Sequence, residues 1–194
     1  MDNKTLKRIE DFIQGKSEEE MSLLFLKPGA TDEVGANVIM QLLTKNGHNV
    51  IFYGPATYTQ ENACIHYKEM FDAFSADPNG KFSFFPTVVD YITRAPIYGF
   101  IVAGEENTIA DVKALCGATK DPAEGTMRNE LFRQLKMPYD KNENRIHASG
   151  KKEEAKREIA NFMSRALAFP ENDHSFDCLN ELVESFQDMA KFKD

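Results

Sequence analysis

The sequence has few cysteines, no tryptophan and no long apolar run. Its three cysteines, Cys64, Cys116 and Cys178, are odd in number, far apart and outside any C-x-x-C arrangement. This pattern excludes a disulfide scaffold and a cysteine-based zinc site, and it is typical of the cytoplasm, where we expect the protein to be located. No segment approaches the roughly 20 apolar residues that span a bilayer, and the first residues lack the apolar stretch of a secretion signal, so we expect no membrane partner.

Basic residues are also in deficit. The chain has 23 lysines and arginines against 31 aspartates and glutamates, a formal net charge of −8. Such an acidic chain repels phosphate backbones, which argues against a nucleic-acid partner, although a local basic pocket is compatible with it. Hydrophobic residues make up 42% and charged residues 28% of the 194 positions, proportions typical of a globular chain with one core.

The order of the expected elements predicts the fold class. Strands are expected where short apolar runs end at glycine or proline, and helices where apolar residues recur three or four positions apart. In chain order we expect a strand at 21–27, a helix at 31–46, a strand at 48–54, a helix at 57–74 with a second at 85–92, a strand at 97–104, a helix at 109–116, a long loop at 118–144, a short strand at 145–149 and a helix at 151–169. This is the order of an α/β (α+β) ferredoxin-like sandwich: a four-stranded antiparallel sheet covered by helices, with an inserted helical pair.

Two boundaries follow from local signals. Gly54-Pro55 is expected to end the second strand, because proline cannot donate to a ladder. Thr57 and Gln60 have the spacing of a capping box, which is expected to start the next helix.

The domain organisation follows from composition. Residues 1–20 are polar, with a weak helical stripe, and we interpret them as an N-terminal appendage. Residues 21–169 hold the alternating strands and helices of the domain. Residues 170–194 carry apolar side chains at helical spacing and are interpreted as a C-terminal helical extension.

One of the four histidines stands out. His147 lies in the segment NRIHASG, where small residues leave room for a ligand and a helix is expected directly behind. A neutral imidazole is a competent nucleophile at cellular pH, and its phosphorylated form is labile enough to pass the phosphoryl group on. From the residues alone, a surface or capped histidine is the commoner case, and His48, His66 and His174 are interpreted that way. The usual phosphate-loop, dinucleotide and zinc-protease motifs are absent from the sequence.

Four segments, taken in order, carry a family resemblance. FLKPGA, CIHYKEM, GATKDPAEGTMR and NRIHASGKKEEAKREI resemble motifs of the nucleoside diphosphate kinases, and FFPTVVDYITRAPIYGFIVAG matches the family pattern before the third expected strand. The resemblance runs from about residue 22 to residue 165. It implies an enzyme that moves the γ-phosphate of a nucleoside triphosphate such as ATP to a nucleoside diphosphate, in a ping-pong cycle through a phosphohistidine at His147.

The resemblance also implies roles for other residues. Phosphates would be held by donors at Lys27, Tyr67, Lys113, Thr119, Arg128 and Asn144, with Lys27 also acting in catalysis. The base would pack against Phe84 and Val88, and Glu158 and Ser149 would orient the imidazole. Mg²⁺ is the implied cofactor, held mainly by the nucleotide phosphates with no protein metal ligand. Cations and hydroxyl donors suit this chemistry, because phosphoryl transfer spreads negative charge over several oxygens.

Most of these residues have an ordinary alternative role. A lysine at a strand end, such as Lys27, is usually solvated, and an arginine after a turn, such as Arg128, is usually a rim charge. Phe84 continues an apolar stripe, and core packing is the commoner role of a phenylalanine. Glu158 on a helix is commonly an exposed charge, and Ser149 before one is commonly an N-cap.

The sequence also departs from the family pattern. Lys27-Pro28-Gly29-Ala30 replaces the usual Lys-Pro-Asp-Gly, and Lys113 stands where an arginine is usual, which loses bidentate geometry. The loop at 120–125 is shorter than the common form, which in the family helps to build trimer contacts within hexamers. A homo-oligomer is expected, with a hexamer favoured and a dimer or tetramer possible.

Two other functions are open to this fold. The first is a non-catalytic nucleotide-binding or scaffold module, which the appendages and Lys113 favour. The second, an RNA-binding ferredoxin-like sheet, is disfavoured by the net charge and by the lack of the aromatic strand motif.

Overall fold

The computed structural model describes residues 1–136 and 144–167. The strands are β1 (Glu20–Leu26), β2 (Asn49–Ala56), β3 (Ile97–Gly104) and β4 (Ile146–Ala148). The helices are α1 (Asn3–Ile13), α2 (Glu33–Lys45), α3 (Gln60–His66), α4 (Lys68–Ala76), α5 (Phe85–Thr93), α6 (Thr108–Cys116), α7 (Met127–Leu135) and α8 (Lys152–Ala166).

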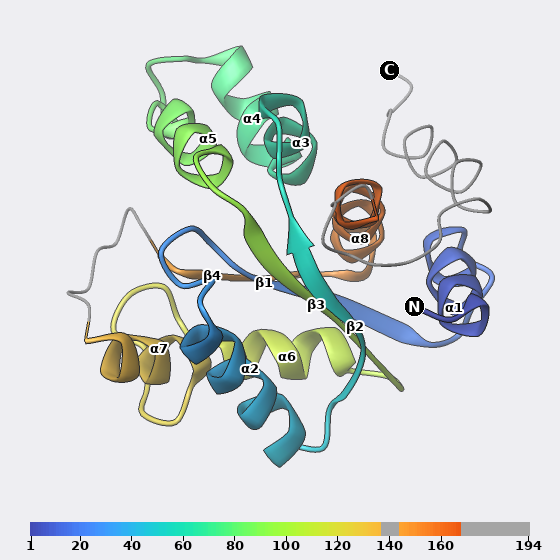
Figure 1. Ribbon diagram of the computed structural model, residues 1–194. Coiled ribbons are helices and arrows are strands. Elements are labelled where there is room, and N and C mark those ends of the chain that lie inside the picture. The colour runs from blue at the N-terminus through green and yellow to red at the C-terminus, as the bar shows by residue number, and fades with distance from the viewer. Residues whose placement is uncertain (137–143, 168–194) are drawn as a thin grey trace.

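The four strands form one antiparallel sheet in the order β2-β3-β1-β4, with helices on both faces (Figure 1). One face carries a core with residues of α1, α3, α5 and α8, and the other a core with residues of α2, α6 and α7. The predicted α+β sandwich with a four-stranded antiparallel sheet is confirmed.

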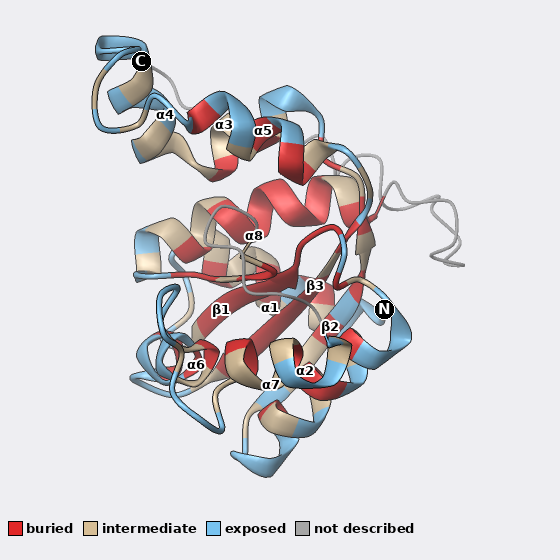
Figure 2. Cartoon of the chain, turned by 90° about the vertical axis from the view of Figure 1, so that its left-hand side faces the viewer, coloured by how far each residue is buried: buried red, intermediate tan, exposed pale blue. Residues whose placement is uncertain are grey.

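Strand β1 lies in the middle of the sheet and contributes side chains to both cores. Leu23 and Phe25 point into one core and Leu24 and Leu26 into the other, and all four are fully buried. Figure 2 shows the resulting continuous buried band between the helical layers. Burying one such side chain is worth about 1.5–3 kcal/mol, so an apolar run without alternation is what a strand covered on both faces requires.

Strand β2 differs from the expected one at its end. It continues through Gly54 and Pro55 to Ala56, with Pro55 paired to Tyr98 of β3. The expected stop was wrong because β2 is an outer strand of the described sheet, where a missing N–H on the open side costs no ladder bond.

The inserted helical pair contains three helices. The capping box is formed by Thr59 and Asn62, two residues after the expected start. The expected single helix is interrupted at Tyr67, whose φ of −98° and ψ of 39° leave helical geometry and separate α3 from α4. This break comes directly after His66, and both residues contact the ring of His147.

The segment expected to be a long loop contains helix α7. Met127 and Leu131 are fully buried, and α7 packs against α2. Two buried apolar positions in a short polar helix give too weak a periodic signal to predict. Residues 137–143 of this segment lie outside the described part of the chain.

The N-terminal segment forms helix α1, which follows the weak stripe in the sequence. Leu6, Ile9 and Phe12 are buried in the same core as α8. The expected extension at 170–194 lies outside the described residues. Among residues 1–136 and 144–167, no helix is both long and apolar enough to cross a bilayer.

Candidate active site

His147 is the central residue of the short strand β4. It pairs with Phe25 of β1, and the two rings stack with centroids 5.0 Å apart. Its neighbours Ile146 and Ala148 are buried on the opposite side of the strand, since successive side chains alternate. The pairing with the most buried strand of the sheet therefore fixes both the position and the direction of the imidazole.

Glu158 of α8 is hydrogen-bonded to one nitrogen of this ring. Its Oε2 lies 3.0 Å from His147 Nε2 and accepts a hydrogen bond from Ser149 Oγ at 2.6 Å. Glu158 is 3% exposed, so its alternative role as a surface charge does not apply. Ser149 does not cap α8, whose N-cap is Lys151, and instead binds the backbone of Leu23.

The surroundings determine the state of the imidazole. Burial first, and then Lys27, Lys113 and Arg128, lower the pKa of His147 well below its usual range, so the ring is neutral at neutral pH. Burial raises the pKa of Glu158. With Nε2–H donated to the carboxylate, the lone pair of the neutral His147 ring lies on Nδ1.

His66 of α3 is a neighbour that the sequence interpretation missed. It is 1% exposed, and its ring meets that of His147 edge-on with centroids 4.5 Å apart. Its Nε2 lies 3.7 Å from Glu158 Oε1, and neither ring nitrogen has a hydrogen-bond partner among the described residues. Burial lowers the pKa of His66 well below its usual range. The sequence feature that could have pointed to His66 is its position next to Tyr67 in the segment CIHYKEM.

Three cations surround the open side of the site. Lys27 is 6% exposed and Arg128 is 5% exposed, so neither is the solvated charge that is common at such positions. Burial first, and then Arg128 and Lys113, lower the pKa of Lys27 to about 7. Within the described residues, none of the three forms a salt bridge with a carboxylate. Two of these cations, Lys27 and Arg128, are buried and Lys113 is exposed, and such a group favours an anionic ligand.

Hydrogen bonds position these cations. Lys27 Nζ donates to Asn144 Oδ1 at 3.0 Å and lies 5.7 Å from the Tyr67 ring centroid. Lys113 Nζ donates to the carbonyl of Ala148, next to His147, at 2.6 Å. Arg128 Nε donates to the carbonyl of Gly117, and its buried Nη1 has no partner among the described residues.

A pocket of about 440 Å³ opens beside this group. It is lined by Lys27, Tyr67, Met70, Phe84, Thr87, Val88, Tyr91 and Asn144. Phe84 is 50% exposed, which excludes the core role that its apolar stripe suggested. The pocket therefore combines apolar side chains, Phe84 and Val88, with the polar groups of Lys27 and Asn144.

The expected residues fall into three groups. His147, Glu158 and Ser149 are joined by hydrogen bonds, while Lys27, Tyr67, Phe84, Val88 and Asn144 line the pocket. Lys113 and Arg128 lie close enough to lower the pKa of His147 without lining the pocket. Thr119 is exposed between α6 and α7 and is not one of the residues that line the pocket. Tyr91, which lines the pocket, was not predicted.

The described residues contain one group with metal-ligating atoms close together. These are His66, His147 and Glu158, whose ligand atoms lie within 4.8 Å of one another. Because Nε2 of His147 is already bound to Glu158 and cations lie nearby, this group favours hydrogen bonding over a resident metal ion.

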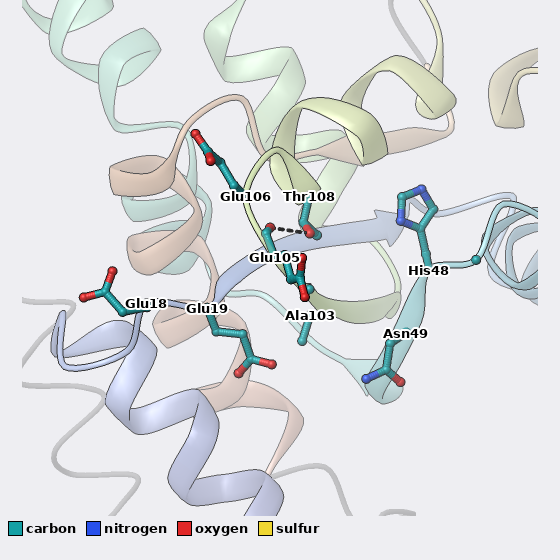
Figure 3. A pocket seen from close by; sticks show the side chains of 10 residues that line it. Glu18, Glu19, His48, Asn49, Ala103, Glu105, Glu106 and Thr108 are labelled. Atoms are coloured by element: carbon teal, nitrogen blue, oxygen red, sulfur yellow. Dashed lines mark hydrogen bonds between the residues drawn. The ribbon is translucent and has the colours of Figure 1, made fainter.

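A larger pocket, of about 730 Å³, lies at the other end of the sheet (Figure 3). Its lining includes Glu18, Glu19, Glu105 and Glu106, together with His48. Four carboxylates repel phosphates, so the smaller pocket beside His147 is the candidate for an anionic ligand.

Comparisons with known proteins agree with this geometry. The family model described as nucleoside diphosphate kinase matches residues 20–167. The nucleoside diphosphate kinase of Halalkalibacterium halodurans is 34% identical over 72% of this chain and 86% of its own, and that of Pyrococcus furiosus is 33% identical over 74% and 83%. The structure of a halophilic nucleoside diphosphate kinase from Halobacterium salinarum in complex with CDP aligns with a TM-score of 0.59 at 26% identity, over 85% of this chain and 98% of that one. The chain therefore belongs to the nucleoside diphosphate kinase family.

Proposed function

We propose that this protein transfers the γ-phosphate of a nucleoside triphosphate to a nucleoside diphosphate through a phosphohistidine at His147. The observation that carries the proposal is the hydrogen bond of 3.0 Å from His147 Nε2 to the buried Glu158, which directs the Nδ1 lone pair away from the carboxylate. Family membership and the cations beside this ring support the same reaction.

Binding uses the two ends of the pocket. The base packs on the exposed ring of Phe84 and on Val88, and since every base has a flat face, this contact accepts all bases. The phosphates extend toward Lys27, Asn144 and Arg128, where they restore the charge balance of the buried cations.

The transfer occurs in two steps: phosphorylation of His147 and transfer of the phosphoryl group to the acceptor. Nδ1 attacks the γ-phosphorus, the bond from that phosphorus to the bridging oxygen breaks, and the nucleoside diphosphate leaves with the electron pair. The ring gains positive charge, which the carboxylate of Glu158 stabilises through Nε2–H. A terminal oxygen of a second nucleoside diphosphate then attacks the phosphorus on Nδ1, the phosphorus–nitrogen bond breaks, and its electron pair returns to Nδ1, which regenerates the neutral imidazole.

Mg²⁺ fits this site as part of the nucleotide. The described residues of the pocket lining offer one amide oxygen, from Asn144, and hydroxyls, but no carboxylate. Mg²⁺ prefers a few carboxylates plus substrate phosphates, so here the phosphates would hold it and it would neutralise their charge. Asn144 and Lys27 would then orient the phosphates.

The scaffold alternative requires a nucleotide-like pocket without chemistry. The joint presence of His147, Glu158, Ser149 and the three cations weighs against it, because nucleotide binding alone does not need an imidazole with an oriented tautomer.

The environment and assembly of the protein are also part of the proposal. Cys64 and Cys116 are free thiols, which supports a cytoplasmic location. Tyr53 of the outer strand β2 is 57% exposed and Val34 of α2 is 47% exposed. Large apolar side chains beside an open strand support homo-oligomerisation, with a hexamer favoured and a dimer or tetramer possible.

Steady-state kinetics test the reaction. ATP and GDP are varied against each other in the presence of Mg²⁺. The proposal predicts parallel double-reciprocal lines, because the first product leaves before the second substrate binds. Intersecting lines, or tight ADP binding without transfer, would overturn it and favour the scaffold.

A further inference from the structure

Arg145 is a buried cation that the proposed reaction does not use. It precedes β4 in the sequence, two residues before His147, and it is 8% exposed. Its Nη1 donates to the carbonyl of Pro28 at 3.0 Å and to the Tyr91 hydroxyl at 3.1 Å. The Tyr91 hydroxyl donates to the same Pro28 carbonyl at 2.9 Å, so three groups form a closed triangle.

The triangle joins three elements that carry the proposed site. Pro28 follows Lys27, Tyr91 lies on α5 with Val88, and Arg145 lies between Asn144 and β4. The backbone repeats the connection, because Lys27 N–H donates to the Arg145 carbonyl at 2.8 Å. A single guanidinium therefore connects the phosphate end of the pocket to the helix that carries the base platform.

Gly29 leaves room for this arrangement. It has a φ of +89°, and a Cβ built there would lie 2.4 Å from Arg145 Nη1. The position is the one at which the sequence departs from the Lys-Pro-Asp-Gly pattern. A side chain at 29 would displace the guanidinium from the Pro28 carbonyl, so the glycine and Arg145 belong to one structural unit.

We propose that Arg145 is a positioning residue that sets the distance between the base platform on α5 and the phosphate-binding end of the pocket. Its contacts to Pro28 and Tyr91 fix α5 relative to Lys27, and the fixed spacing lets one ligand engage both ends at once. This inference rests on the proposed function for the identity of the ligand. It assigns Arg145 no contact with the nucleotide.

The distinguishing prediction concerns two ligands. ADP engages both ends of the pocket, whereas ribose 5-diphosphate keeps the sugar and phosphates but has no base to meet α5. A shift of α5 lowers the affinity only for ADP, because ADP must contact both ends of the pocket. General damage to the pocket weakens both equally.

The experiment measures the affinity of the full chain for both ligands by calorimetry. Arg145→Met removes the hydrogen-bond donors and keeps the apolar part of the side chain. Tyr91→Phe removes only the hydroxyl and tests the same unit if Arg145→Met does not fold. Arg94→Met is the matched control, because Arg94 is an exposed arginine whose Cζ lies 4.5 Å from the centroid of the same Tyr91 ring.

We expect Arg145→Met to weaken ADP binding by about tenfold or more and to change ribose 5-diphosphate binding by less than about twofold. Tyr91→Phe should act in the same direction by a smaller factor, and adding it to Arg145→Met should cause little further loss, because both act through one unit. Arg94→Met should leave the ratio of the two affinities unchanged.

Two results would overturn the role of Arg145: an equal loss for both ligands in the folded variant, or no loss for ADP. A wild-type protein that binds neither ligand would overturn the nucleotide site itself, and the role of Arg145 with it.

Discussion

The two ends of strands β1 and β3 differ in the charge and burial of the groups around them. At one end, where Phe25 pairs with His147, Lys27 and Arg128 are buried beside a pocket of about 440 Å³. At the other end, where Glu20 pairs with Gly104, a pocket of about 730 Å³ is lined by acidic side chains (Figure 3). The two ends are separated by five residues of strand, about 17 Å.

Under the proposed function, the larger pocket is not at the reactive end of the sheet. Carboxylates in an open, wet pocket need no ligand to remain charged. Buried cations that have no carboxylate partner among the described residues raise the free energy of the ligand-free protein until an anion binds. The lowered pKa of Lys27 reflects this unfavourable burial of charge. The free energy stored in this arrangement is available for binding phosphates, so function is expected at the smaller pocket.

The sharpest test of the comparison replaces a histidine at each end. His147→Ala should reduce phosphoryl transfer from ATP to GDP by roughly 10⁴-fold or more, because the nucleophile is lost. His48→Ala, at the acidic pocket, should leave the rate unchanged. A coupled assay measures both, with thermal melting to confirm folding. A folded His147→Ala variant with substantial activity would contradict the assignment.

A second test removes one charge at each end. Lys27→Gln should lower kcat/KM by roughly 10²- to 10³-fold, the range found when one donor to a developing charge is lost. Glu105→Gln should change kcat/KM by less than about twofold. Steady-state kinetics on the two folded variants provide the ratio, and equal losses would mean that the acidic end also contributes to catalysis.

Glu158→Gln sharpens the account of the histidine itself. The amide keeps a hydrogen-bond acceptor near Nε2 but loses the charge that stabilises the phosphorylated ring. We expect the rate of His147 phosphorylation to fall by about 10- to 100-fold, with ADP affinity nearly unchanged. Rapid quench with labelled ATP measures the rate. An unchanged rate would show that the carboxylate is dispensable.

The pKa of Lys27 predicts how nucleotide affinity depends on pH. Bound phosphates favour the charged lysine and raise its pKa above the value of about 7 in the free protein. Affinity is therefore full below pH 7 and falls as the pH rises, by up to tenfold per unit. Calorimetry with ADP between pH 7.5 and 8.5 should show this fall, and Lys27→Gln should abolish it. A flat wild-type profile would refute the lowered pKa.

The smallest expected effect comes from Lys113→Arg. Lysine binds as a point charge, whereas an arginine can present two donors to a phosphate. The variant should tighten ADP binding by about threefold. Weaker binding would indicate that the bond from Lys113 to the Ala148 carbonyl matters more than contact with the phosphates.

The sequence predicted the elements whose patterns are strong and failed where the signal was local or weak. Strand β1 and helix α8 carry long apolar patterns and were placed correctly. Helix α7 is short and mostly polar, and Met127 and Leu131 are its two buried apolar residues, so it was taken for a loop. The end of β2 depended on its position at the edge of the sheet, which a proline in the sequence does not reveal.

The residues of the candidate site could be proposed one by one from the sequence, but their arrangement could not. His147, Glu158 and Ser149 share one segment and were proposed together. His66 comes from a helix 81 positions earlier, and its contact with His147 exists only because α3, β1 and β4 pack together. The triangle of Arg145, Tyr91 and Pro28 likewise depends on tertiary structure, since two of its members are ordinary residues in the sequence.

The most direct test of the central claim is to incubate the protein with γ-labelled ATP and Mg²⁺ without an acceptor, and to isolate the protein. The account predicts a label on His147 that is acid-labile and alkali-stable and that transfers to added GDP, with none on His147→Ala. Absence of label on a wild-type protein that still binds nucleotide, or label on another residue, would contradict it.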